Sequence, residues 1–185
     1  MKNSVGRYVP EANSLRPFQG AFATAPDMNR QAPAVKTKKP GESKLYTNLK
    51  EVFDKIPVRD GMTLSFHHHF RNGDKVVNQV LEVAAELGLK NLTVALSSVF
   101  PVHQPLIEHF KSGTVTHLDT NYLSGPVAQA ISQGVLAKPI MLRTHGGRAR
   151  AIECGQLHID VAFIAAPAAD SYGNLSGIAG PTACG

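Results

Sequence analysis

Hydrophobic and polar positions along residues 47–165 repeat with two periods, one typical of buried strands and one typical of amphipathic helices. Short apolar runs predict strands at Met62–Phe66, Leu92–Ser97, Val115–Leu118, Ile140–Arg143 and Ile159–Ala165. Apolar residues spaced three and four apart predict helices at Thr47–Ile56, Asp74–Leu87, Val102–Lys111 and Pro126–Gln133, with a helical turn at Ala149–Glu153. Strand and helix therefore alternate along the chain.

This alternation predicts an α/β fold. Gly88, Gly113 and Gly134 each follow an expected helix, at the position where a left-handed C-cap favours glycine. Strands with nearly continuous apolar runs are typical of parallel sheets that are covered on both sides. We therefore expect a mainly parallel, Rossmann-like sheet with helices on both faces.

Residues 1–44 follow a different pattern, with five prolines and no periodicity. They hold eight of the 19 Lys and Arg residues but three of the 14 acidic residues, so residues 45–185 carry equal numbers of each sign. The pattern predicts an extended basic N-terminal arm over 1–44, which wraps the body or docks on a partner, and an α/β domain over 45–185. The glycine-rich residues 173–185 suggest that this domain is truncated at its C-terminal end.

Composition narrows the function classes. The neutral body has no arginine-rich helix and no basic stripe with aromatic residues, so we expect no nucleic acid partner. No apolar run reaches the length of a membrane span, so we expect no membrane contact. Cys154 and Cys184 lie far apart without a CxxC motif, which suits a reducing, cytoplasmic location.

Three histidines, His67, His68 and His69, follow the first expected strand, and Arg71 comes two residues later. Open α/β folds place their ligand sites where strands end in such loops. Imidazole and guanidinium groups there would suit a carboxylate or a thioester carbonyl. Two other interpretations stay open, namely histidines that only bind loop backbone and histidines that bind a metal. Adjacent histidines are poorly placed to chelate one ion, so we expect no metal site.

A second strand end carries the sequence RTHGGRAR at residues 143–150. Glycine lets a backbone approach a ligand closely, and arginine suits an anion such as a carboxylate or a phosphate. The candidate residues are Arg143, His145, Gly146, Gly147, Arg148 and Arg150. The alternative is that these arginines lie on a solvated face.

A third strand end carries DSYGNLSG at residues 170–177, in which Gly173 and Asn174 are candidate binding residues. An ordinary turn is the alternative, because Ser, Gly and Asn are common turn formers. Asp119 and Asn121 follow another strand and would join the same rim. There is no GxSxG elbow, and Cys154 has no local histidine, so no nucleophile is predicted.

The strings FHHHFRNGD, THLDTNYLSGPV, RTHGGRARAIE and AAPAADSYGNLSGI, together with the arm, resemble the N-terminal part of the citrate lyase alpha subunit. More distantly the chain is similar to the first half of coenzyme A transferases, with a glycine-rich first loop that binds an acyl oxyanion. Histidines stand here where those glycines would be. Asp170, Gly173 and Asn174 match the wider family's aspartate and glycine–asparagine turn. The resemblance implies two similar α/β halves with the active site between them, so this chain would hold one half.

That resemblance also implies an activity, which is citrate:acetyl-acyl-carrier-protein transfer. Citrate would replace acetyl on the carrier thiol to give a citryl thioester and acetate, and a separate lyase (beta) subunit would release oxaloacetate. The partners would be citrate, the acetyl- or citryl-acyl carrier protein and the beta subunit in a hetero-oligomeric complex. The chain itself would bind no cofactor tightly, because the coenzyme A-like phosphoribosyl-dephospho-CoA group sits on the carrier. His68 and His69 would be catalytic, and a non-catalytic binding and assembly module is the alternative.

Overall fold

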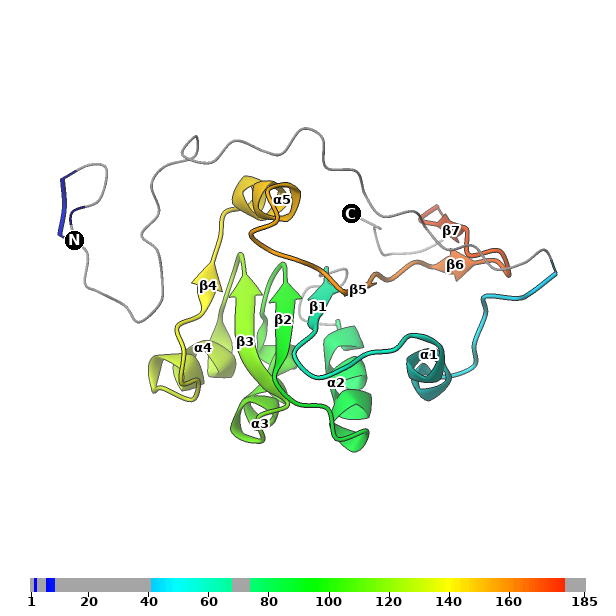
Figure 1. Ribbon diagram of the computed structural model, residues 1–185, viewed down its shortest axis with the longest axis horizontal. Coiled ribbons are helices and arrows are strands. Elements are labelled where there is room, and N and C mark those ends of the chain that lie inside the picture. Colours follow the sequence, from blue (N-terminus) through cyan, green and yellow to red (C-terminus); the bar gives the residue numbers. More distant parts are fainter. Residues whose placement is uncertain (1, 3–5, 9–40, 68–73, 179–185) are drawn as a thin grey trace.

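The computed structural model describes residues 2, 6–8, 41–67 and 74–178. Its centre is a five-stranded, all-parallel sheet with the strand order β4-β3-β2-β1-β5 (Figure 1). The strands are β1 Thr63–Phe66, β2 Leu92–Leu96, β3 Val115–Thr120, β4 Met141–Leu142 and β5 Val161–Phe163. A separate antiparallel hairpin joins β6 Ala168–Ala169 to β7 Leu175–Ser176. The predicted parallel sheet is confirmed.

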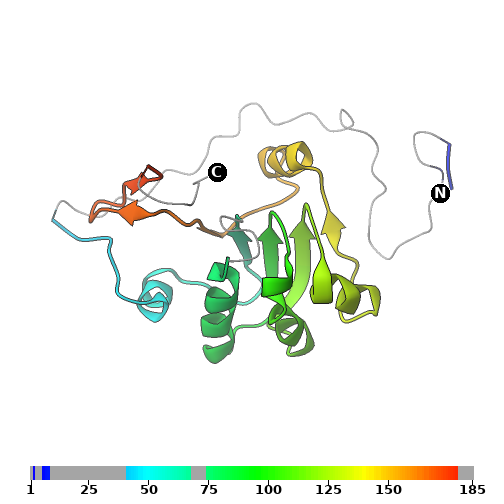
Figure 2. The same ribbon diagram turned by 180° about the vertical axis from the view of Figure 1, so that it is seen from behind.

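Helices lie on both sides of this sheet, as predicted. They are α1 Leu49–Lys55, α2 Val76–Glu86, the 3-10 helix η2 Pro101–His103, α3 Leu106–Lys111, α4 Gly125–Ser132 and α5 His145–Glu153. Figures 1 and 2 show α2, α3 and α4 against one face, whereas α5 lies over the carboxyl ends of the strands on the other side. The helices therefore leave the two faces unequally covered.

The main core lies between the sheet and helices α1 to α4. Alternate residues of each strand point to this side, so Leu64 and Phe66 of β1 face it beside Val94 and Leu96 of β2, all at most 2% exposed. Full burial of one such side chain stabilises the fold by about 1.5–3 kcal/mol. Phe163 of β5 stacks on Phe66 with ring centroids 5.3 Å apart, which fastens the edge strand to the same core.

A smaller cluster holds α5 on the opposite face. Ala95 of β2 packs there against Ala151 of α5 and Leu157, each at most 7% exposed. The strand register places Ser65, Ala95 and Asp119 side by side on this face, across β1, β2 and β3. The small Ala95 side chain lets α5 approach a row that is otherwise polar.

Several boundaries differ from the prediction. The expected helix over Val102–Lys111 is split into η2 and α3, because Pro105 has no N–H to continue a helix and stands instead at the N-cap of α3. The expected strands over Ile140–Arg143 and Ile159–Ala165 shrink to β4 and β5, which each have one neighbour in the sheet. The helical turn expected at Ala149–Glu153 is the second half of α5, which begins at His145.

Most of the expected N-terminal arm lies outside the described residues. Its last residue, Lys44, donates its backbone N–H to the carbonyl oxygen of Ser171 at 2.8 Å, so the end of the arm contacts the β6–β7 hairpin. The boundary after residue 44 stays a prediction. Within the ranges described, no helix is long and apolar enough to cross a membrane.

Candidate functional site

The strand order creates a switch point between β1 and β5. The chain adds β2, β3 and β4 successively on one side of β1, and then returns to add β5 on the other side. Open α/β sheets bind ligands in the crevice outside the carboxyl ends of the strands at such a point. His67 directly follows β1 there and is half-buried. His68, His69 and Arg71 lie outside the described residues, so their roles stay predictions.

Arg143 and Asp119 form an ion pair at the carboxyl ends of β3 and β4. The Arg143 Nε atom donates to Asp119 Oδ2 at 2.7 Å, with 15% and 7% of the two side chains exposed. Asn121 binds the same segment, since its Nδ2 atom donates to the carbonyl oxygens of Arg143 at 3.1 Å and Thr144 at 2.7 Å. The structure thus brings Asp119, Asn121 and Arg143 together on the predicted rim.

The predicted glycine loop at 143–150 is mostly the start of α5. Thr144 is the N-cap, and its Oγ1 atom accepts a hydrogen bond from the N–H of Gly147 at 2.9 Å. A Cβ atom on Gly147 would lie 2.8 Å from that oxygen, whereas a Cβ on Gly146 would meet nothing within 4 Å. The Gly147 N–H therefore caps the helix instead of facing a ligand. His145 and Gly146 are exposed on the first turn.

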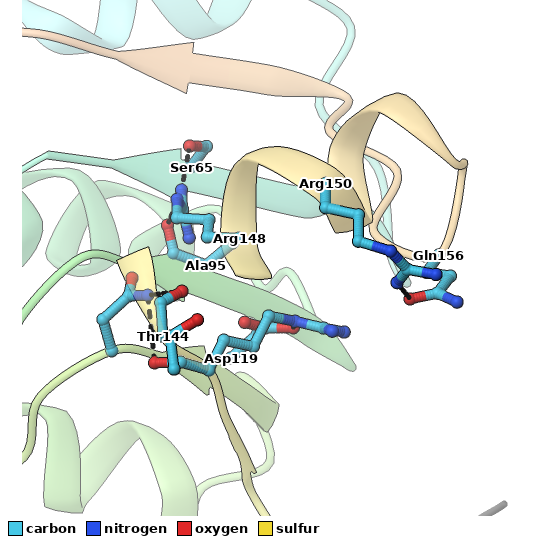
Figure 3. A network of polar contacts seen from close by, with 9 residues as sticks. Ser65, Ala95, Asp119, Thr144, Arg148, Arg150 and Gln156 are labelled. Atoms are coloured by element: carbon cyan, nitrogen blue, oxygen red, sulfur yellow. Dashed lines mark hydrogen bonds and ion pairs between the residues drawn. The ribbon is translucent and has the colours of Figure 1, made fainter. Parts of the chain in front are cut away.

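The Arg148 side chain extends from α5 over the row of Ser65, Ala95 and Asp119. Figure 3 shows its guanidinium group directed at Ser65 and Ala95, and its Nη2 atom donates to Ser65 Oγ at 2.9 Å and to the Ala95 carbonyl oxygen at 3.1 Å. Burial lowers the pKa of Arg148, with an opposing effect from Asp119, yet arginine remains charged at neutral pH. Arg148 Nη1 and Asp119 Oδ1 are buried without a hydrogen-bond partner among the described residues.

Arg150 is separated from the other two arginines. Its Nη1 atom donates to Gln156 Oε1 at 3.3 Å, on the side of α5 away from Ser65 (Figure 3). The sequence thus placed three arginines in one group, but their side chains take three different directions. Arg143 pairs with an acid, Arg148 holds the sheet and Arg150 bonds an amide.

Gly173 and Asn174 lie in the turn between β6 and β7, beyond the β5 edge of the sheet (Figures 1 and 2). The pKa of Asp170 is lowered mainly by hydrogen bonds from the side chain and backbone of Asn174. Backbone hydrogen bonds from Tyr172 and Gly173 contribute less. Gly173 has a φ of 87°, which favours glycine in this turn. The structure does not bring these residues to the arginines, and their binding role stays a prediction.

Ser65 is a site residue that the sequence reading missed. It shares with Thr63 the face opposite Leu64 and Phe66, and this alternation of polar and apolar residues was its signal. Thr144 was also missed, although a threonine before a helix is a common N-cap. Among the residues that the structure describes, no group of three or more His, Cys, Asp or Glu residues could hold a metal ion.

Three comparisons with known proteins agree. The model of the family named "Citrate lyase, alpha subunit" matches residues 42–185. The citrate lyase alpha chain of Escherichia coli strain K12 is 45% identical over 165 residues, which cover 89% of this chain and 31% of that protein. The alpha chain of Klebsiella pneumoniae is 39% identical over 94% of this chain and 33% of its own. The chain therefore spans about a third of the length of these relatives.

A solved structure shares the fold. It is named as the alpha subunit of citrate lyase from Streptococcus mutans in complex with citrate. The similarity covers 100% of this chain and 36% of that one, with a TM-score of 0.88 and 43% sequence identity.

Proposed function

Because the chain belongs to the citrate lyase alpha-subunit family, we propose that its protein is a citrate transferase of the citrate lyase complex. The observation that carries this proposal is the citrate complex of a relative that matches the whole of this chain at 43% identity. The reaction exchanges acetyl for citrate on the thiol of an acyl carrier protein. Its products are a citryl thioester and acetate, and a separate lyase (beta) subunit then forms oxaloacetate.

The exchange balances without a redox partner. The bond between the acetyl carbonyl carbon and sulfur breaks, and a bond between a citrate carboxyl carbon and the same sulfur forms. One oxygen of that citrate carboxylate must leave, and it departs in the acetate. Negative charge develops on carbonyl oxygens along this path, so hydrogen-bond donors fixed near the carbonyl speed the reaction. The coenzyme A-like group arrives on the carrier protein, and we assign no residue of this chain to it.

We assign the carboxylates of citrate to the arginine-bearing rim at the β3–β4 end of the sheet. Arg143 uses Nε for Asp119, which leaves the two terminal nitrogens of its fork for a carboxylate. His145 and Gly146 lie beside it at the exposed start of α5. Arg148 and Gly147 serve mainly to hold this rim, since Arg148 Nη2 already bonds β1 and β2 and the Gly147 N–H already caps the helix. Arg150 is the third arginine assigned to citrate, and its Nη1 atom is shared with Gln156.

We assign the thioester carbonyl to residues 67–71, which follow β1 at the switch point in sequence. Imidazole donors of His68 and His69 would stabilise the oxyanion, with His67 and Arg71 binding the substrate. Histidine is suited to this task because its charge changes near neutral pH. Gly173 and Asn174 would join these substrate-binding residues only if the β6–β7 hairpin moved toward the carboxyl ends of β1 and β5.

The proposal is tested by acyl exchange in the full natural polypeptide that carries this sequence. The protein is mixed with acetyl-coenzyme A, as a surrogate for the carrier, and with citrate labelled with oxygen-18 in its carboxylates. We expect citryl-coenzyme A and acetate in equal amounts, with one heavy oxygen in each acetate. Unlabelled acetate, or no citryl thioester, would contradict the transfer.

A binding and assembly module is the second candidate, since the chain spans only about a third of the curated relatives. In that case the basic arm would dock on an acidic carrier protein or on sister subunits. Carrier binding without any citryl thioester, in the full polypeptide and its complex, would favour this candidate over the transferase.

A further inference from the structure

Asp119 is a buried acid at the carboxyl end of β3, and its charge acts on two arginines. Its Oδ2 atom accepts a hydrogen bond from Arg143 Nε at 2.7 Å. The same carboxylate reaches Arg148 through space, where burial lowers the pKa of the guanidinium group and the charge of Asp119 opposes that effect. A buried charge is costly unless it is paired, so this carboxylate depends on its arginine partners.

The backbone of Arg143 is held independently of the ion pair. Its N–H donates to the carbonyl oxygen of Thr120 at 2.8 Å, and its own carbonyl oxygen accepts from Asn121 Nδ2 at 3.1 Å. Both polar groups of the Arg143 main chain are therefore bonded to the end of β3 or to the residue after it. The part of Arg143 that these bonds leave free to turn is its side chain, and Asp119 holds that side chain at Nε.

The two arginines differ in what they leave for a ligand. Over the residues that the structure describes, the terminal nitrogens of Arg143 have no protein partner and are not among the buried unpartnered atoms. Arg148 instead uses Nη2 for Ser65 and Ala95, and its Nη1 atom is buried. The accessible fork is thus that of Arg143. Because a guanidinium group is planar, a bond at Nε also sets the direction of its two terminal nitrogens.

We propose that Asp119 is a positioning residue for citrate, which holds Arg143 at Nε so that the two terminal nitrogens of that arginine bind one citrate carboxylate. This inference rests on the proposed function, which assigns the citrate carboxylates to this rim. Asp119 acts through Arg143 and does not touch citrate, because two carboxylates repel each other. Two guanidinium groups face the single carboxylate of Asp119, so the cluster keeps a positive charge for the anion.

The alternative is that the ion pair only fastens β4 to the sheet. This edge strand pairs with β3 at two positions, Asp119 with Met141 and Thr120 with Leu142. A residue that only fastens the strand would affect both substrates, and its loss would matter whether or not residue 143 is an arginine. A positioning residue would affect citrate alone, and its effect would vanish without Arg143.

The variants are made in the full natural polypeptide and assayed for citryl-coenzyme A formation from citrate and acetyl-coenzyme A. We expect Asp119→Ala and Arg143→Ala each to raise KM for citrate about tenfold or more, with KM for acetyl-coenzyme A within about threefold of the wild type. Asp119→Asn should raise KM for citrate about threefold, because its amide oxygen is a neutral and weaker acceptor for Nε. Glu108→Ala is the matched control, since it breaks an exposed ion pair with Lys111 on α3 and should change neither KM.

Asp119→Ala is then combined with Arg143→Ala. Because Asp119 acts through Arg143, the double variant should keep the citrate KM of Arg143→Ala to within about twofold. Calorimetric titration with citrate measures the binding step without turnover and should give the same order of affinities. If Asp119→Ala does not fold, the same cycle is run with Asp119→Asn, whose threefold effect should also vanish beside Arg143→Ala.

A citrate KM that stays unchanged in Asp119→Ala, or in Asp119→Asn where that variant replaces it, would overturn the positioning role. An unchanged citrate KM in Arg143→Ala would overturn it too. An equal rise in both KM values, or a rise of the same size with and without Arg143, would show that Asp119 only fastens β4. A wild-type protein that forms no citryl thioester would instead overturn the proposed function, so the two failures are distinct.

Discussion

At the residue scale, Arg143 and Arg148 are five positions apart and make different contacts. Arg143 lies at a strand end, uses one nitrogen for Asp119 and keeps the end of its fork available. Arg148 lies one turn into α5 and uses one nitrogen to bridge Ser65 and Ala95, which are paired across β1 and β2. In our proposal Arg143 binds a carboxylate, whereas Arg148 holds α5 against the sheet.

Removing Arg148 should therefore affect folding. Arg148→Ala removes two hydrogen bonds made by a charged group, each worth about 1.5–3 kcal/mol, and it exposes the row at Ser65. We expect a loss of about 2–4 kcal/mol in the free energy of unfolding, measured by urea denaturation, which is less than the sum of the two bonds because the variant no longer buries a charged group. Arg150→Ala is the matched control on the same helix and should lose less than about 1 kcal/mol, since its bond at 3.3 Å is to the exposed Gln156. Equal losses in the two variants would contradict the role given to Arg148.

At the scale of elements, α5 shows where sequence patterns reached their limit. Two consecutive glycines are unfavourable in a helix by about 1 kcal/mol each, so Gly146 and Gly147 suggested a loop. The Thr144 cap and the contact between Ala151 and Ala95 outweigh that preference. The cap could have been suspected from Thr144, but the contact joins residues 56 positions apart and left no trace in the local pattern.

The strands and the α2 helix were predictable because the pattern of apolar and polar side chains within each segment determines its secondary structure. Leu64 and Phe66 alternate with Ser65, and the apolar face of α2 repeats with a helical period, so local pattern and burial agree. The directions of the three arginines depend on partners in β1, β3 and residue 156, which sequence spacing does not specify. The sequence therefore placed several candidate residues at strand ends, where the structure has them, whereas the contacts of their side chains were not foreseen, and their binding roles stay predictions.

The two glycines of α5 should respond differently to alanine. A Cβ at position 147 would meet Thr144 Oγ1 at 2.8 Å and break the cap, which is typically worth about 1 kcal/mol. A Cβ at position 146 meets open space, so Gly146→Ala should stabilise the helix by about 0.5–1 kcal/mol. We expect Gly146→Ala to melt at a higher temperature than Gly147→Ala in calorimetry. The reverse order would show that the Thr144 cap does not govern this end of α5.

At the scale of the whole molecule, the two faces of the sheet differ in what covers them. Helices α1 to α4 enclose an apolar core on one side, whereas α5 and a polar row occupy the other (Figure 1). The rim residues gather at the carboxyl ends of the strands, and the chain spans about a third of the length of its relatives. We propose that this sequence supplies one side of a citrate transferase site and that the other side comes from a region matching the rest of these relatives.

The most direct test of that account compares two lengths of protein in one assay. Citryl-coenzyme A formation from citrate and acetyl-coenzyme A is followed by mass spectrometry with residues 1–185 alone and with the full natural polypeptide. We predict a citryl thioester from the full polypeptide and none from residues 1–185, although this shorter chain is folded by circular dichroism. Exchange by residues 1–185 alone would contradict the claim that the site is completed by the rest of the protein. Absence of exchange in both would contradict the transferase itself.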